Sequence, residues 1–190
     1  MTGILPLARL GAFIVAIAAA APVAAQKPLA IDHDASRVGF EATQMGVTVE
    51  GGFSDWDAEL RIDEADPAAS TARVVVRTAS IDAGHGDTNA EVKRGNWLAV
   101  EQFPEAVFES TSVTRRDDGT WLATGALRIR DQTETVEVPF TVDKGADGAR
   151  RITGSFTIKR ATFNVGGGAW GDFDVVANEV RVTFDLHARV

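Results

Sequence analysis

The stretch 179–190 reads Glu-Val-Arg-Val-Thr-Phe-Asp-Leu-His-Ala-Arg-Val, and it decides the fold class. Apolar and polar residues alternate along it without a break. Successive side chains of a β-strand point to opposite faces, so this period of two predicts a strand with one buried and one solvated face. The residues predicted to face inward are Val180, Val182, Phe184, Leu186, Ala188 and Val190.

The same alternation runs back along the chain to about residue 38. It is clear at 121–130, 135–142 and 152–159, and weaker at 38–40, 47–53, 58–62 and 74–76. Turn-forming residues separate these segments: Met45-Gly46, Asp66-Pro67, Asp117-Asp118-Gly119, Arg130-Asp131-Gln132 and Gly145-Ala-Asp-Gly148. The pattern predicts roughly eight or nine strands in an antiparallel meander, which buries its apolar face either as a sandwich or as a closed barrel.

One polar stretch, Asp87-Thr-Asn-Ala-Glu-Val-Lys-Arg-Gly95, interrupts the alternation. Thr88 and Glu91 have the spacing of a capping box, in which each side chain accepts from the other residue's backbone N–H. Gly95 can end a helix in the left-handed conformation. The sequence therefore predicts one short helix over residues 89–94.

Composition excludes several classes of function. The 190 residues carry a formal net charge of −8 and include no cysteine. Absence of cysteine excludes a thiol nucleophile, a thiolate metal site and any disulfide. The acidic balance argues against nucleic acid as a partner, because phosphate binding needs a basic face.

Residues 1–25 have the pattern of a secretory signal peptide. Arg9 precedes the apolar run 10–21, and Pro22-Val-Ala-Ala25 supplies the small residues that a signal peptidase recognises. The run is shorter than the roughly 20 residues that a membrane-spanning helix needs. We expect cleavage near Ala25, a single domain over 26–190, a periplasmic location and no stable membrane insertion afterwards.

No catalytic constellation is visible in the sequence. It contains no Gly-x-Ser-x-Gly elbow, and the glycine-rich stretch 166–171 lacks the Lys-Ser/Thr of a phosphate-binding loop, so we interpret it as a wide turn. His33 and His187 are interpreted as turn and surface residues, and no third ligand completes a metal site around them. His85 lies between glycines before the helix, and it is either an exposed loop residue or a contact for a ligand headgroup.

The apolar face is the remaining candidate site. A barrel of about eight strands is just wide enough either to be filled by side chains or to hold one small ligand. Many predicted inward residues are small, which leaves room, but periodicity alone does not exclude a fully packed core.

The chain resembles the YceI-like family of secreted lipid-binding proteins over nearly all of the predicted mature region. The resemblance rests on motifs in the following order: Ile31-Asp32 with Ser36-Arg37-Val38-Gly39-Phe40, Gly51-Gly52-Phe53 with Trp56, Ser80-Ile-Asp-Ala-Gly84, Asn96-Trp97 with Phe103-Pro-Glu-Ala-Val-Phe-Glu-Ser110, Gly125-Ala-Leu-Arg-Ile129, and Ile158-Lys-Arg-Ala-Thr-Phe-Asn-Val-Gly166 with Trp170 and Asn178-Glu-Val-Arg-Val182.

This resemblance implies an all-β, eight-stranded antiparallel lipocalin-like barrel with one short helix. It also implies a tunnel for a polyisoprenoid lipid, such as a prenyl phosphate or quinone, and no catalysis. The sequence departs from the family pattern at Ala35-Ser36 and Thr88-Asn89, where the family often has His-Ser and Arg-Asp. Both changes remove groups that could hold a polar headgroup.

From this resemblance we expect a set of ligand-binding residues and no metal, catalytic residue or cofactor other than the lipid. Trp97 and Trp170 would lie near one end, and His85, Arg160 and Asn164 would form a polar mouth. The expected ligand-binding residues are Phe40, Phe53, His85, Trp97, Phe108, Phe140, Phe156, Arg160, Phe163, Trp170 and Phe184.

The expected function is transport, storage or a stress response, by a monomer or dimer. A packed-core interaction module and a hydrolase with a buried histidine–carboxylate pair are the alternatives.

Overall fold

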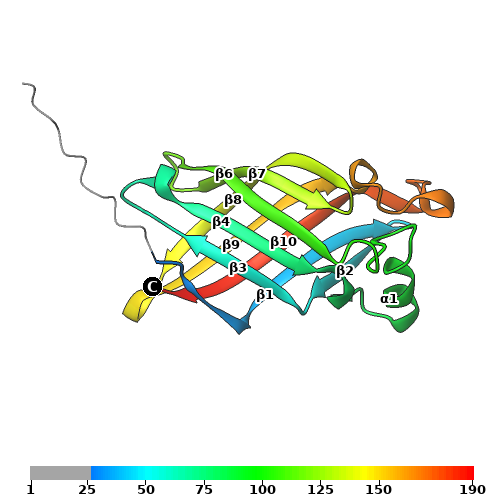
Figure 1. The fold of residues 1–190 in the computed structure, drawn as a ribbon, viewed down its shortest axis with the longest axis horizontal. Helices are drawn as coiled ribbons and strands as arrows, with labels where there is room; N and C mark the ends of the chain where they lie inside the picture. The colour runs from blue at the N-terminus through cyan, green and yellow to red at the C-terminus, as the bar shows by residue number, and fades with distance from the viewer. Residues whose placement is uncertain (1–26) are drawn as a thin grey trace, which may run out of the picture.

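The computed structural model describes residues 27–190, and the predicted signal peptide lies outside this range. Ten strands and one α-helix, α1 (Gly86–Val92), make up the described part, with short 3-10 turns between them (Figure 1). The strands are β1 (Ala30–Gln44), β2 (Val47–Phe53), β3 (Trp56–Arg61), β4 (Thr71–Arg77), β5 (Ile81–Asp82), β6 (Glu105–Arg115), β7 (Trp121–Ile129), β8 (Gln132–Lys144), β9 (Ala149–Lys159) and β10 (Val176–Arg189).

All strands belong to one antiparallel sheet in the order β3-β4-β6-β7-β8-β9-β10-β1-β2-β5. Strands β2 and β3 follow each other across a kink at Ser54-Asp55, as β4 and β5 do across a 3-10 turn. Backbone hydrogen bonds cross both kinks, from Ser54 N to Ser80 O (3.3 Å) and from Arg77 N to Asp55 O (2.9 Å). Two bent segments therefore each count as two strands, which explains ten strands where the resemblance implied eight.

The curled sheet closes least completely between the first half of β1 and β3. Strand β1 pairs with β2 only from Val38 onward, and β3 is the terminal strand of the sheet order. A backbone bond from Leu29 N to Leu60 O (2.8 Å) joins the two segments at one end. The His33 ring packs against Trp56 beside this seam, with centroids 4.6 Å apart.

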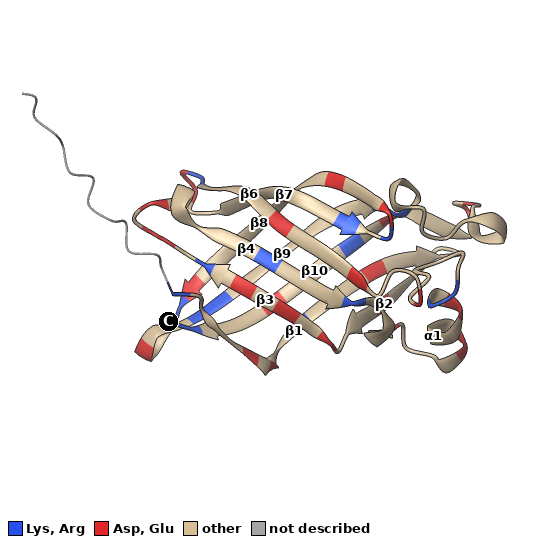
Figure 2. Cartoon of the chain, viewed as in Figure 1, with Lys and Arg blue, Asp and Glu red and all other residues tan. Residues whose placement is uncertain are grey.

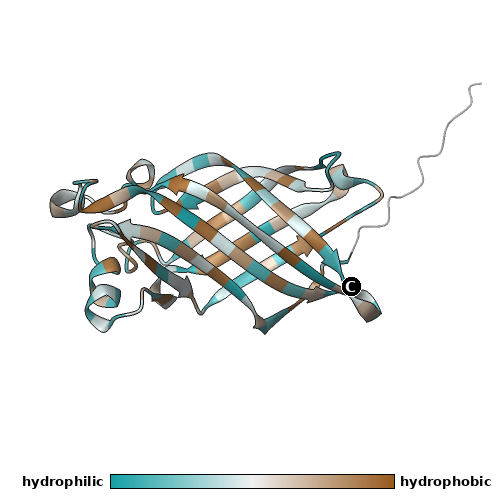
Figure 3. Cartoon of the chain, turned by 180° about the vertical axis from the view of Figure 1, so that it is seen from behind, coloured by the Kyte–Doolittle hydropathy of each residue, from teal (hydrophilic) through white to brown (hydrophobic). Residues whose placement is uncertain are grey.

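The predicted alternation is visible along the strands (Figure 3). On β7, Trp121, Ala123 and Leu127 are buried while Leu122 and Thr124 between them are half-buried. The prediction for Val190 is wrong: this residue is 79% exposed because it lies past the last strand pair. The Met45-Gly46 turn has positive φ at both residues, as the tight hairpin turn requires.

The helix differs from its prediction. It begins at Gly86 with His85 at the N-cap position and ends at Val92, and no side chain caps its N-terminus. The predicted capping box is wrong because the helix begins earlier, so Thr88 lies within the first turn and not at the N-cap position. The Glu91 carboxylate accepts hydrogen bonds from Trp170 Nε1 and from the Arg94 guanidinium (each 2.9 Å). Gly95 does not have positive φ.

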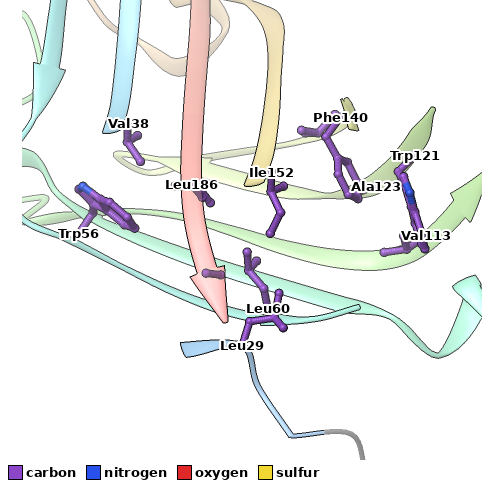
Figure 4. Close-up of a cluster of buried hydrophobic side chains, with 12 residues drawn as sticks. Leu29, Val38, Trp56, Leu60, Val113, Trp121, Ala123, Phe140, Ile152 and Leu186 are labelled. Atoms are coloured by element: carbon purple, nitrogen blue, oxygen red, sulfur yellow. The ribbon is translucent and has the colours of Figure 1, made fainter. Parts of the chain in front are cut away.

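A hydrophobic core fills the end of the barrel that holds the chain's C-terminus (Figures 1 and 4). The Trp121 and Phe140 rings stack with centroids 5.9 Å apart. The Arg115 guanidinium lies 5.6 Å from the Trp121 ring centroid. Each fully buried large side chain contributes about 1.5–3 kcal/mol to folding. We call this region the packed end; its buried members are Leu29, Val38, Trp56, Leu60, Val113, Trp121, Ala123, Val138, Phe140, Ile152, Leu186 and Ala188.

Candidate functional site

The opposite end of the barrel, beside α1, contains a cavity of about 460 Å³. We call this region the hollow end. This volume lies within the range of roughly 300–1,000 Å³ that is usual for small-molecule sites. The strands contribute apolar side chains to its wall, listed here in chain order: Val38, Phe40, Ala42, Val49, Phe53, Val76, Ile81, Ala106, Leu127, Ile129, Phe156, Ile158, Val176, Val180 and Val182.

The cavity floor is the edge of the packed core. Val38, Phe53, Val76 and Phe156 border the cavity and also belong to, or pack against, the core cluster. The same strands carry different inward side chains to the two ends. Along β10 the cavity receives Val180 and Val182, whereas the core receives Leu186 and Ala188 after the aromatic Phe184.

The mouth of the cavity is formed by α1, the end of β1 and the loop from 160 to 176. Asp87, Thr88 and Glu91 line it from α1, and Gln44 lines it from β1. Figure 2 shows the acidic residues of this helix. The Trp97 and Trp170 rings meet with centroids 5.6 Å apart, and the Trp170–Glu91 hydrogen bond ties the loop to α1.

Arg160 lines the cavity but is only 2% exposed. Its guanidinium donates to five backbone carbonyls at 2.7–3.0 Å, so all five of its N–H donors are used. Burial lowers the pKa of Arg160 from its usual value, yet arginine remains charged in proteins. Its acceptors are the carbonyls of Val165, Gly166, Trp170, Val176 and Ala177.

The loop around Arg160 is held by further backbone contacts. The N–H groups of Gly166 and Gly167 both donate to Asn96 O (2.7 and 2.9 Å). Gly166 has φ of +77°, and a Cβ there would lie 2.2 Å from an Arg160 nitrogen, so only glycine fits. Arg130 donates to the carbonyls of Trp97 and Asn164, which joins the two loops at the mouth.

The structure brings seven of the eleven predicted ligand-binding residues to the cavity wall, and places the other four elsewhere. Phe140 stacks on Trp121 in the core. Phe108 and Phe184 pack against the core, close to where Gly125 and Gly154 lack side chains on neighbouring strands. The seven at the wall are Phe40, Phe53, Trp97, Phe156, Arg160, Phe163 and Trp170.

The predicted polar mouth is built differently from the expectation. His85 is exposed and outside the cavity lining, and Asn164 is an exposed residue with φ of 56° that ends a 3-10 turn. Arg160 reaches the cavity, but all of its N–H groups donate to backbone carbonyls. The carboxylates of Asp87 and Glu91 were missed, although their spacing of four residues puts them on one face of a helix.

Ser36, which follows the departing Ala35, and Asn89, which is itself a departure from the family pattern, have structural roles. Ser36 is buried, and its hydroxyl donates to Asp32 O (2.6 Å) and accepts from His187 N (2.8 Å). Asn89 donates to Asp82 Oδ1 (3.0 Å) and accepts from Ala83 N (2.6 Å), which fastens α1 to β5. The pKa of Asp82 is lowered from its usual value, with the Asn89 hydrogen bond as the largest cause.

The three histidines lie outside the cavity wall. His33 borders a separate groove of about 500 Å³, which lies between β1 and the bent segment of β2 and β3. His187 lies 3.4 Å from Asp185 with 42% of its side chain exposed. Over residues 27–190 no group of three or more His, Asp or Glu side chains is arranged to hold a metal ion.

A sequence profile described as the YceI-like domain matches residues 29–188. The chain belongs to the YceI-like family. A UPF0312 protein of Ectopseudomonas mendocina is 31% identical over 134 residues, covering 67% of this chain and 70% of that protein. A UPF0312 protein of Yersinia pestis is 35% identical over 86 residues, where the match spans 44% of the relative's length.

Solved structures share the fold. BcnA of Burkholderia cenocepacia superposes with a TM-score of 0.81 at 34% identity, covering 83% of this chain and 99% of that one. A polyisoprenoid-binding domain from Saccharophagus degradans gives a TM-score of 0.67 at 14% identity, covering 85% and 98% of the two chains. At that identity the likeness concerns the fold alone. In the described part of this YceI-like chain, no helix is long and apolar enough to cross a membrane.

Proposed function

We propose that this YceI-like protein is a binding protein that holds the apolar tail of a long isoprenoid-type lipid at the hollow end of its barrel. The observation that carries the proposal is the cavity of about 460 Å³ between a packed floor and a mouth formed by loops. Between the floor and the mouth, the cavity wall is built from aliphatic and phenylalanine side chains. Burial of a lipid tail there would contribute about 0.8 kcal/mol per methylene.

The fold likeness to a polyisoprenoid-binding domain supports the choice of an isoprenoid ligand. The cavity also favours a binding protein over a module that acts only through its surface, because a packed barrel would be more stable without it. The histidines lie outside the cavity wall, which favours binding over a hydrolase that works through a buried histidine–carboxylate pair.

Native mass spectrometry of the protein purified from its own cells, followed by solvent extraction, tests this proposal. We expect a stoichiometric apolar adduct whose extracted mass corresponds to an isoprenoid lipid. A bare polypeptide that also takes up no added prenyl lipid would contradict the proposal and favour an interaction module.

We further propose that the protein is secreted to the periplasm and that residues 1–25 are removed. The pattern of Arg9, the apolar run 10–21 and the small residues up to Ala25 supports this. N-terminal sequencing of the protein from a periplasmic extract should start at Gln26. A protein that stays in the cytoplasmic fraction with its Met1 end intact would contradict it.

The surface beside the mouth supports exchange of the ligand with a lipid surface. Met45 and Val47, on the β1–β2 hairpin, are 76% and 66% exposed, and Phe173 in the adjoining loop is 49% exposed. Met45 N donates to Val175 O (2.9 Å), so hairpin and loop lie side by side. A Met45→Ser, Val47→Ser variant should take up lipid from vesicles several-fold more slowly than Val190→Ser, a single exposed apolar change away from the mouth. Equal rates would contradict this role.

A further inference from the structure

The polar groups at the mouth of the cavity bear on which end group the bound lipid can carry. Besides the two tryptophans and the buried Thr78, five side chains with polar atoms border the cavity. Asp87 and Glu91 are carboxylates, and Arg160 is a cation. Gln44 and Thr88 are neutral.

The cation is not available to a ligand as a donor. A phosphate taken out of water must replace its lost hydrogen bonds, and bidentate guanidinium contacts are the usual replacement. All five N–H groups of Arg160 already donate to backbone carbonyl oxygens. These oxygens are the negative ends of the carbonyl dipoles, and they offset the positive charge of the guanidinium. Moving Arg160 toward a phosphate would leave those carbonyls without their donor.

The carboxylates also disfavour an anion. Asp87 is exposed, borders the cavity and has no hydrogen-bond or ion-pair partner among the described residues. Glu91 is one helical turn away, and its only cationic partner within residues 27–190 is Arg94, whose side chain is 71% exposed and lies outside the cavity lining. An anionic end group at the mouth would meet these two like charges, which is a repulsion that discriminates against it.

The neutral groups offer an alternative. The Gln44 amide can both donate and accept, as can the Thr88 hydroxyl, and neither side chain has a hydrogen-bond partner within residues 27–190. Trp97, which also borders the cavity, has a buried Nε1 donor that no acceptor in the described chain satisfies. A carbonyl or hydroxyl at the end of an apolar tail could pair with such groups without bringing a charge beside the carboxylates.

We propose that the cavity selects lipids with an uncharged polar end, such as a prenyl alcohol or a quinone, over the prenyl phosphate with the same tail. This inference rests on the proposed function, because it concerns the headgroup of the lipid whose tail the hollow end would hold. The inference goes beyond the proposed function because it assigns Asp87 and Glu91 as the residues that discriminate against anions.

Two probes with identical tails, farnesol and farnesyl monophosphate, test the selectivity in a tryptophan-fluorescence titration checked by native mass spectrometry. We expect the alcohol to bind at least about tenfold more tightly than the monophosphate at low ionic strength. The ratio should shrink as salt rises toward about 1 M, because salt screens the repulsion between charges at the mouth.

Matched variants locate the effect. The double variant Asp87→Asn, Glu91→Gln removes both negative charges at the mouth. The amide oxygen introduced by Glu91→Gln can still accept from Trp170 Nε1. The ratio of the affinity for the alcohol to the affinity for the monophosphate should fall several-fold. Asp117→Asn with Asp147→Asn changes the net charge equally in two exposed turns outside the cavity lining, and the ratio should stay unchanged.

The outcomes separate the two proposals. Equal or tighter binding of the monophosphate by the unmodified protein would overturn the headgroup inference and leave lipid binding standing. A ratio that both double variants change alike would overturn the assignment to Asp87 and Glu91. Failure of both probes to bind, together with no adduct on the purified protein, would overturn the proposed function itself.

Discussion

Strand β10 crosses both ends of the barrel, and its inward side chains change along its length. Val180 and Val182 leave space at the hollow end, whereas Leu186 and Ala188 are buried at the packed end. Strand β7 runs the other way, from Trp121 in the core to Ile129 at the cavity. The same ladder of hydrogen bonds thus supports a stabilising core at one end and a cavity at the other.

The largest expected effect comes from breaking the loop that closes the hollow end. Arg160→Met leaves five carbonyls without their donor, so we expect the free energy of unfolding to fall by about 3–5 kcal/mol. Arg151→Met, which removes an exposed ion pair with Asp185 on the outer surface, should cost at most about 1 kcal/mol. Urea unfolding of both variants measures the difference, and similar losses would contradict the role of Arg160.

Adding the same side-chain volume at the packed end and at the hollow end should change the stability of the protein differently. Ala123→Leu overfills the packed end, where Ala123 is 2% exposed, and should destabilise the protein by about 1–3 kcal/mol. Ala106→Leu extends into the cavity and should change stability by less than about 0.5 kcal/mol while weakening lipid binding. Thermal unfolding and a lipid titration on each variant check this, and the reverse order of stabilities would show that the hollow end is not empty space.

Neighbouring glycines in the mouth loop give a smaller, matched test. Gly166→Ala places a methyl group against Arg160 at positive φ, and should cost about 1–3 kcal/mol of unfolding free energy. Gly167→Ala has no atom within 4 Å of the new Cβ, so its effect should stay within about 0.5 kcal/mol. Equal stabilities of the two variants would mean that the loop does not clamp Arg160 as described.

The smallest effect is a local response to acid. The pKa of Asp82 lies below its usual value because Asn89 and the Gly84 N–H donate to the ionised carboxylate. A lowered pKa in the folded state means that this stabilisation is complete above the unfolded value of about 3.9 and is lost as pH falls through the folded value. NMR signals of α1 should therefore shift and broaden below about pH 4 before those of β7. Asp82→Asn should abolish this early change, whereas simultaneous loss of both sets of signals in the unmodified protein would contradict it.

The sequence predicts most of the fold because alternation is a local property. The period of two at Trp121, Ala123 and Leu127 places these residues inward, and the Met45-Gly46 dipeptide places a turn. The number of strands was harder to predict, because the alternation is weak around the kink at Ser54-Asp55 and around the 3-10 turn after Arg77.

The site was less predictable because alternation gives the face of a residue and not what it meets there. Phe140 and Phe156 both point inward, yet one stacks on Trp121 and the other borders the cavity. The capping box at Thr88 and Glu91 was a sound local pattern, but the helix begins at Gly86, and Trp170, 79 residues away, donates to a Glu91 carboxylate oxygen. The five-carbonyl clamp around Arg160 has no local signal, since its acceptors are backbone groups.

Photo-cross-linking with a prenyl alcohol that carries a diazirine in its tail would show which end of the barrel holds the lipid. After irradiation, peptide mass spectrometry locates the modified residues. We predict cross-links at the hollow end, on Phe40, Phe156 and Val182, and none on Trp121 or Leu186 at the packed end. Cross-links confined to the outer surface, or distributed equally over both ends, would contradict a barrel whose hollow end holds the lipid.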